Sequence, residues 1–163
     1  MKILYFGGQK SGKSTLGEAK TIELSDSKPF YIATYDRNFD DKEMNTRVLK
    51  HKNQREERFI TIEEPKNLVS KIEEGKTYLI DCISMWILNN IENSEEELIS
   101  QLNELEKINA NIVFVLNDVN SGVIPFDKES RKFVDLTGII GQKLSSICDE
   151  VYEVKLGLQS RLK

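Results

Sequence analysis

The sequence lacks the features that mark several classes of protein. No stretch approaches the roughly 18 consecutive apolar residues that a membrane-spanning helix needs, and the opening apolar run, MKILYFGG, is too short for a signal peptide. Basic residues are not in excess, since the 163-residue chain has a formal net charge of −4 at pH 7. An acidic balance argues against general nucleic-acid binding. We therefore expect neither a membrane span nor a nucleic-acid partner.

Cysteine and histidine are scarce. The two cysteines, Cys82 and Cys148, both lie in apolar sequence. Two buried free thiols in a reducing compartment explain them better than a disulfide. By default, rather than from positive evidence, we expect a cytoplasmic protein. The single histidine, His51, lies in the basic stretch RVLKHKNQR at 47–55. Taken alone, a histidine in such a stretch is most often part of a solvated helix face.

The composition is that of a globular protein. Hydrophobic residues make up 39% and charged residues 31%, a balance without the signature of disorder. The length fits one domain of ordinary size, and no repeat, low-complexity tract or linker interrupts it. We expect a single domain over residues 1–163.

Short apolar runs alternate with helical patterns along the chain. Most of the runs are continuous rather than alternating, which is typical of strands covered on both faces in a parallel sheet. Between them, Ser94–Ile108 opens with a capping box and carries a leucine stripe, and a similar apolar stripe follows Pro125. The alternation predicts right-handed βαβ units in an open, mostly parallel sheet with helices on both faces. The expected strands are Lys2–Phe6, Phe30–Thr34, Phe59–Ile62, Tyr78–Cys82, Asn111–Asn117 and Glu150–Lys155.

The first expected strand runs into GGQKSGKST, which fits the Walker A pattern from Gly7 to Ser14. Glycines let the backbone point successive N–H groups at a phosphate, and the following helix adds the positive end of its dipole. In this pattern Lys13 reaches the terminal phosphates and the Ser14 hydroxyl binds Mg²⁺. We therefore expect an α/β fold of the P-loop NTPase type, with a nucleotide site at the loop.

An acidic partner for the loop is expected at the end of a nearby strand. Tyr78-Leu79-Ile80-Asp81 is an apolar strand that ends in a carboxylate. Asp81 is the candidate to hold Mg²⁺, directly or through water. The alternative is an aspartate that only caps the following helix.

Several kinds of P-loop protein remain open at this point. A guanine-nucleotide switch would carry an Asn-Lys-x-Asp motif after a late strand, whereas here Leu116-Asn117-Asp118 lacks both the lysine and the spacing. An enzyme acting on a small molecule fits better. A binding or regulatory module without chemistry is compatible with the loop alone.

The spacing of His51 from two arginines, four residues away on either side, indicates a role in nucleotide chemistry. The segment Asp40–Gln54 has a helical pattern, on which Arg47, His51 and Arg55 share one face at i, i+4 and i+8. A neutral imidazole is a competent nucleophile near pH 7, and neighbouring cations favour the neutral form. His51 is thus a candidate to attack a nucleotide phosphorus while the arginines stabilise the departing pyrophosphate.

These blocks together resemble the bifunctional adenosylcobinamide kinase / adenosylcobinamide-phosphate guanylyltransferase family of cobalamin biosynthesis. The Arg-x3-His-x3-Arg block and the Asn-x-Val-x2-Gly-x-x-Pro block are its most specific features. The resemblance covers nearly the whole chain, in order: GGQKSGKST, YIAT at 31–34, DDKEM, RVLKHKNQR, TIEEP at 61–65, LIDCISMWILNN at 79–90, NDVNSGVIP at 117–125 and SRKFVDLTG at 130–138.

The resemblance implies two reactions. The first phosphorylates the aminopropanol hydroxyl of adenosylcobinamide with ATP or GTP. The second transfers GMP from GTP to that phosphate through a guanylylated histidine, here His51, and releases pyrophosphate. Mg²⁺ is the expected cofactor. The resemblance also implies a homotrimer. A relative with only one of the two activities stays an alternative.

The resemblance also implies roles for single residues. His51 and Lys13 are the expected catalytic residues, and Ser14 and Asp81 the expected metal ligands. We expect Arg131 and Asp135, one helical turn apart, to form a structural ion pair. The expected nucleotide-binding residues are Gly8, Gln9, Lys10, Ser11, Gly12, Lys13, Ser14, Thr15, Thr34, Asp36, Arg37, Arg47, Arg55, Glu63 and Asp81.

The chain departs from the family pattern at a few positions. Asp118 replaces a glutamate, Phe59 a tryptophan and Gly141 an asparagine, and the loop Asp36–Phe39 is about two residues longer than usual. Position 118 matters most, because a carboxylate that is one methylene shorter has a shorter reach. If that group serves the kinase step, the substitution weakens that step and leaves the guanylyltransferase residues complete.

Overall fold

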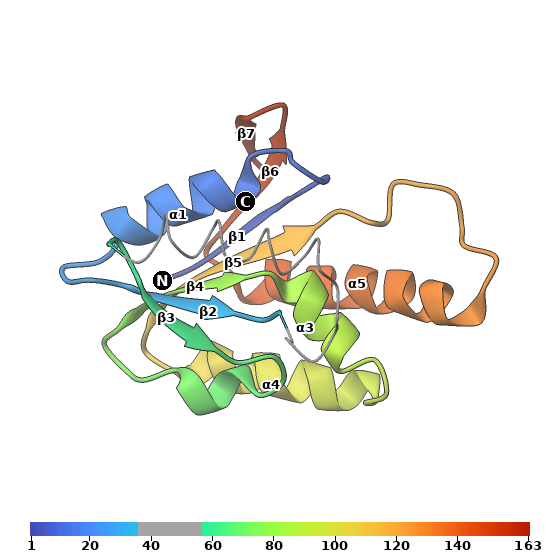
Figure 1. Ribbon diagram of the computed structural model, residues 1–163, viewed down its shortest axis with the longest axis horizontal. Coiled ribbons are helices and arrows are strands. Elements are labelled where there is room, and N and C mark those ends of the chain that lie inside the picture. Colours follow the sequence, from blue (N-terminus) through green and yellow to red (C-terminus); the bar gives the residue numbers. More distant parts are fainter. Residues whose placement is uncertain (36–56) are drawn as a thin grey trace.

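The computed structural model of the chain describes residues 1–35 and 57–163. It shows a seven-stranded sheet in the order β3-β2-β4-β5-β1-β6-β7, in which every neighbouring pair is parallel except β6 and β7. Helix α1 covers one face, and helices α3, α4 and α5 cover the other (Figure 1). The elements are β1 (Lys2–Gly7), α1 (Lys13–Glu23), β2 (Phe30–Ala33), β3 (Ile60–Glu63), the 3-10 helix η1 (Leu68–Lys71), β4 (Thr77–Asp81), α3 (Ile83–Asn89), α4 (Glu95–Lys107), β5 (Asn111–Asn117), α5 (Lys128–Ile147), β6 (Glu150–Lys155) and β7 (Leu158–Arg161).

The predicted fold class is confirmed, and the six predicted strands are present with small shifts at their ends. Phe59 precedes β3 instead of opening it, and Cys82 precedes α3 instead of closing β4. Strand β7 was not predicted. It pairs antiparallel with β6 at the edge of the sheet, and all four of its side chains are exposed.

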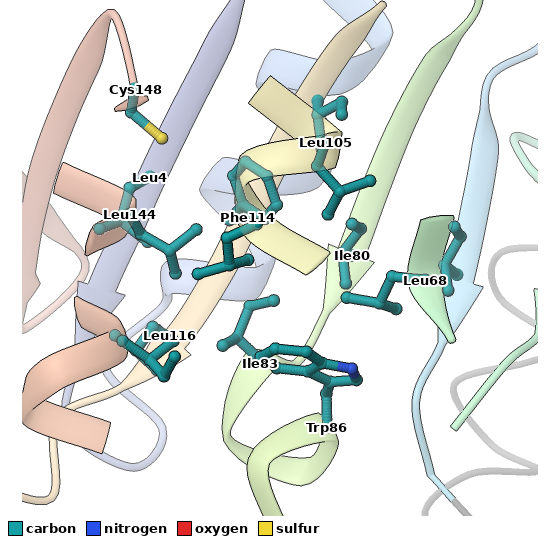
Figure 2. Close-up of a cluster of buried hydrophobic side chains, with 14 of the residues drawn as sticks. Leu4, Leu68, Ile80, Ile83, Trp86, Leu105, Phe114, Leu116, Leu144 and Cys148 are labelled. Carbon is teal, nitrogen blue, oxygen red and sulfur yellow. The ribbon is translucent and has the colours of Figure 1, made fainter. Parts of the chain in front are cut away.

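Both faces of the central strands are buried, which explains their continuous apolar runs. Along β1, Leu4 packs into the core beneath α3, α4 and α5 (Figure 2), while Ile3 and Tyr5 pack on the α1 face. The stripe that was predicted on α4, Leu98, Leu102 and Leu105, is fully buried.

Helix α4 begins as its sequence predicts. Ser94 is the N-cap, and its hydroxyl accepts a hydrogen bond from the Glu97 N–H at 3.2 Å. The Glu97 carboxylate accepts one in return from the Ser94 N–H at 2.8 Å. The predicted capping box is therefore confirmed.

Trp86 is the largest fully buried side chain, and Figure 2 shows it next to Ile83. Its indole N–H donates to the Lys66 carbonyl at 2.8 Å, so the one polar group of the ring is satisfied. The tryptophan thereby fixes α3 next to the carboxyl edge of the sheet, where β1, β2 and β4 all end.

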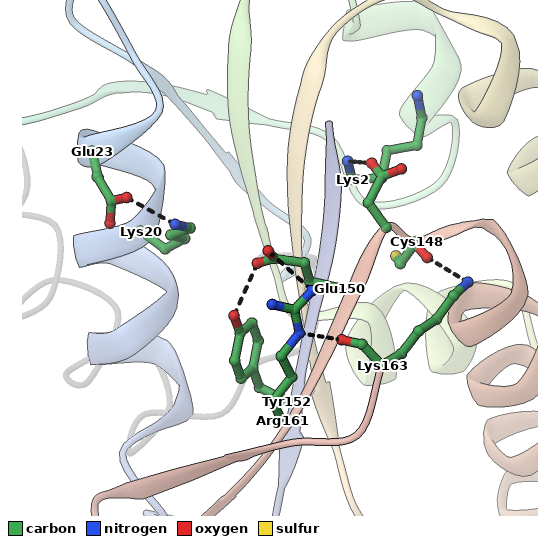
Figure 3. Close-up of polar contacts among 9 residues, drawn as sticks. Lys2, Lys20, Glu23, Cys148, Glu150, Tyr152, Arg161 and Lys163 are labelled. Carbon is green, nitrogen blue, oxygen red and sulfur yellow. Dashed lines mark hydrogen bonds and ion pairs between the residues drawn. The ribbon is translucent and has the colours of Figure 1, made fainter.

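The C-terminal hairpin is held by polar contacts (Figure 3). The Glu150 carboxylate accepts a hydrogen bond from the Tyr152 hydroxyl at 2.9 Å and pairs with Arg161 at 3.4 Å. The Lys163 ammonium donates to carbonyls at the end of α5, including that of Cys148 at 2.6 Å. The last carbonyls of a helix lack partners within the helix, so a cation there stabilises its end.

Within the described residues, no helix combines the length and apolar character that crossing a membrane requires.

Candidate active site

The glycine-rich loop joins β1 to α1 at the carboxyl edge of the sheet. Its first half closes on itself, because the Ser11 N–H donates to the Gly8 carbonyl at 3.2 Å. Lys10 and Gly12 have positive φ angles of 56° and 100°, so the backbone turns back before α1 begins. Such a loop directs its N–H groups inward at the start of a helix, the arrangement that binds phosphate.

The β6–β7 hairpin supports the loop from one side. The Gly157 N–H donates to the Ser11 carbonyl at 2.8 Å, and a Cβ built on Gly12 would lie 3.2 Å from the Gly157 Cα. At the start of the loop, a Cβ on Gly7 would lie 2.3 Å from the Val154 carbonyl oxygen. Sequence reasoning missed this support. The sequence offers one signal for the hairpin turn, which is Gly157 between Leu156 and Leu158, both of them exposed.

Lys13 is folded into the loop. It is 6% exposed, and its ammonium donates to the Gly8 carbonyl at 3.0 Å. Burial lowers the pKa of Lys13 below its usual value, and the attraction of the Asp81 carboxylate partly opposes that shift. The geometry therefore brings together the cation and the carboxylate that the sequence predicted.

Asp81 is the last residue of β4, and one of its carboxylate oxygens accepts a hydrogen bond from the Tyr31 hydroxyl at 2.9 Å. The N-cap of α3 is Cys82, and no side chain caps that helix. The alternative role of Asp81 as a helix cap is therefore wrong.

The donor set at this edge suits magnesium. Ser14 and Asp81 offer oxygen ligands, which Mg²⁺ prefers, and Ser14 lies in the first turn of α1. In residues 1–35 and 57–163, no group of three or more His, Cys, Asp or Glu side chains could hold a metal by itself. Mg²⁺ at phosphate-binding sites is commonly held by one or two protein oxygens together with substrate phosphates and water.

Thr34 and Glu63 lie at the same carboxyl edge of the sheet, where β2 and β3 end. Glu63 pairs in register with Ala33, and Ala33 pairs with Asp81. The Thr34 side chain is fully buried, and its hydroxyl both accepts from the Cys82 N–H at 2.9 Å and donates to the Cys82 carbonyl at 2.8 Å. Thr34 thus fixes the backbone that follows Asp81, a contact that sequence reasoning did not foresee.

The remaining predicted site residues, Asp36, Arg37, Arg47, His51 and Arg55, lie outside the described residues.

Asp118 lies beside the loop. Its N–H donates to the Gly7 carbonyl at 2.8 Å, and its carboxylate accepts from the Asn120 N–H at 3.1 Å and the Ser121 hydroxyl at 2.7 Å. Asp118 and Ser121 line one side of a hollow of about 390 Å³ that also borders the loop and the end of β6. The shorter carboxylate therefore shapes a turn next to the site.

The expected ion pair between Arg131 and Asp135 is wrong. The Arg131 guanidinium donates instead to the carbonyls of Pro125 and Phe126, and no ion pair joins it to Asp135 in the described structure. The arginine thereby closes the loop before α5.

Both cysteines are free thiols, as predicted. Burial, reinforced by the charge of a neighbouring aspartate, raises the pKa of Cys82 and of Cys148 from the ordinary thiol value of 9.0 to about 12. A raised folded-state pKa contributes stability that is complete below pH 9.0 and is lost as the pH rises toward 12. The thiols should therefore stay protonated and unreactive at pH 8.

We expect iodoacetamide at pH 8 to leave Cys148, which is 1% exposed, unmodified in the folded protein. In urea both thiols should react, as counted by peptide mass spectrometry. Equal alkylation rates of Cys148 in the folded and unfolded protein would contradict the assignment.

The parallel sheet and the glycine-rich loop after its first strand define the class, an α/β protein of the P-loop NTPase type. A family model described as "Cobinamide kinase / cobinamide phosphate guanyltransferase" matches residues 3–162. The chain belongs to this family. The resemblance inferred from its motifs is therefore confirmed, and with it the class of enzyme, a transferase.

Curated relatives match over the whole chain. The bifunctional adenosylcobalamin biosynthesis protein CobP of Pseudomonas aeruginosa is 33% identical over 175 residues, covering 100% of this chain and 98% of its own. The proteins named CobU of Escherichia coli and Salmonella typhimurium are 27% and 28% identical, with 100% of both chains covered in each case. Among solved structures, the KaiC-like protein PH0186 of Pyrococcus horikoshii gives a TM-score of 0.45 at 12% identity, covering 93% of this chain and 69% of its own.

Proposed function

We propose that this protein phosphorylates adenosylcobinamide and then transfers GMP from GTP to adenosylcobinamide-phosphate, within one catalytic domain over residues 1–163. The observation that carries the proposal is the family match over residues 3–162. The loop supports it, because Lys13 lies buried in the loop and is attracted by Asp81. The corrinoid and the nucleoside triphosphates are the substrates, and a cytoplasmic homotrimer is the proposed form.

In the first reaction the loop binds the triphosphate through its N–H groups and Lys13. The aminopropanol hydroxyl attacks the γ-phosphorus, the bond from that phosphorus to the β–γ bridging oxygen breaks, and the nucleoside diphosphate leaves. The hydroxyl proton passes to solvent. Mg²⁺, held by Ser14 and Asp81, would neutralise charge on the phosphates.

In the second reaction a ring nitrogen of His51 attacks the α-phosphorus of GTP, and the bond to the α–β bridging oxygen breaks. Pyrophosphate leaves, with Arg47 and Arg55 balancing its charge. The phosphate of adenosylcobinamide-phosphate then attacks the same phosphorus and releases His51. The product is adenosylcobinamide-GDP. Asp36, Arg37, Thr34 and Glu63 complete the proposed nucleotide site.

Two separate assays test the proposal. Adenosylcobinamide with γ-labelled ATP or GTP should yield a labelled corrinoid, and adenosylcobinamide-phosphate with α-labelled GTP should yield labelled adenosylcobinamide-GDP and pyrophosphate. Label in only one product would identify a relative with a single activity. GTP binding without either product would identify a nucleotide-binding module. If phosphate transfer alone fails, Asp118→Glu, which restores the family's usual residue, is the matched variant to assay.

A further inference from the structure

Strand β2 contacts the candidate metal ligand directly through its second residue, Tyr31. The Tyr31 hydroxyl donates to the Oδ2 of Asp81 at 2.9 Å, across a sequence separation of 50 residues. Tyr31 is 3% exposed and Asp81 is half-buried, so the bond is partly shielded from water. Its length lies within the ordinary range for a hydrogen bond between a hydroxyl and an oxygen acceptor.

The tyrosine ring has little freedom to move away. It packs edge-to-face on Phe59, with ring centroids 6.0 Å apart and planes at 78°. Strand pairing sets the position of Tyr31 along β4, because Tyr31 is in register with Leu79 and Ala33 is in register with Asp81. Tyr31, Leu79 and Asp81 therefore share one face of the sheet, the face that α1 and Lys13 cover. The hydroxyl is consequently held beside the carboxylate by both the ring and the backbone.

Thr34, the residue that follows β2, also holds the backbone beyond Asp81. Thr34 bonds to both the N–H and the carbonyl of Cys82, at 2.9 and 2.8 Å. The sequence YIAT, residues 31–34, thus fixes the carboxylate through Tyr31 and the following peptide through Thr34. The Tyr31 hydroxyl engages Oδ2 of this carboxylate.

We propose that Tyr31 is a positioning residue that orients the Asp81 carboxylate and so sets the affinity of the nucleotide site for its divalent cation. This inference rests on the proposed function, because it assumes that Asp81 serves a metal-bound nucleoside triphosphate. Groups that orient a metal ligand typically change metal affinity or activity by about 10–100-fold when they are removed. In this proposal Tyr31 acts only through Asp81.

The test is the Tyr31→Phe variant, which keeps the ring on Phe59 and removes only the hydroxyl. Mn²⁺ binding is measured in the presence of α,β-methylene GTP, which cannot transfer GMP, by the electron paramagnetic resonance signal of free Mn²⁺. We expect the dissociation constant for Mn²⁺ to rise roughly 10-fold. The Mg²⁺ concentration that gives half-maximal GMP transfer should rise by a similar factor, with a smaller change in the rate at saturating Mg²⁺.

Two comparisons separate positioning from a general structural effect. Tyr5→Phe removes the hydroxyl of another buried tyrosine on the same face, one whose ring stacks on Tyr152 at 5.0 Å, and should leave Mn²⁺ affinity unchanged. In an Asp81→Asn background, Tyr31→Phe should cause no further loss, because the two residues act through one contact.

Unchanged Mn²⁺ affinity in Tyr31→Phe would overturn the inference, as would equal losses in Tyr5→Phe or an additive loss in the Asp81→Asn background. The measurement is independent of the corrinoid reactions. A protein that binds Mn²⁺ with the nucleotide but transfers no GMP would contradict the proposed function and leave this inference standing.

Discussion

The His51→Ala variant is expected to take up no covalent label from α-labelled GTP and Mg²⁺, whereas the unaltered protein should form an acid-labile GMP adduct. The expected loss is complete, because alanine offers no atom that can attack phosphorus. The imidazole is suited to the step, since its unperturbed pKa of about 6.5 leaves it largely neutral at pH 7. The adduct is measured as protein-bound radioactivity before and after acid treatment.

Lys52→Ala is the matched control for this experiment. It removes a charge next to His51 but no nucleophile, so the label should persist. GTP binding should survive in His51→Ala, because the phosphate loop is provided by residues 8–15. Retention of the label in His51→Ala would refute the assigned nucleophile, even if the protein proved to catalyse both reactions.

The central sheet could be predicted because its strands are buried on both faces. That burial requires the continuous apolar runs of β1, β4 and β5, and such runs are visible in a sequence. Strand β7, Leu158–Arg161, could not be found in the same way, since all four side chains are exposed and carry no burial pattern. Its pairing depends on β6 and on the contact of Arg161 with Glu150.

Only those parts of the candidate site that form a motif within a short stretch of sequence could be predicted. The interval from Gly7 to Ser14 indicated the loop, and the apolar run before Asp81 indicated its acidic partner. The contacts that hold these parts in place join residues far apart in the chain: Tyr31 to Asp81, and Gly157 to Ser11. Many residues could fill such roles, so no spacing in a single sequence identifies them.

Gly7→Ala should be strongly destabilising, because its new Cβ would lie 2.3 Å from the Val154 carbonyl oxygen and 2.9 Å from the Ser11 hydroxyl oxygen. The first of these is backbone in the neighbouring strand, so no side-chain rotation can relieve the contact. Movement of Gly7 would also disturb its carbonyl bond to the Asp118 N–H at 2.8 Å. We expect the free energy of unfolding in urea to fall by about 3 kcal/mol, the upper part of the usual range for overpacking.

Gly8→Ala is the matched control, because a Cβ at Gly8 would meet nothing within 4 Å. Measured without nucleotide, its free energy of unfolding should change by less than about 1 kcal/mol, as for an unstrained glycine replacement. The two variants differ by one position and add the same methyl group, so a difference between them reports the close contacts at Gly7, of which the contact with the Val154 carbonyl in β6 is the shortest. Equal unfolding midpoints would show that β1 and β6 can separate at their carboxyl ends, and that the hairpin does not support the phosphate loop as the geometry indicates.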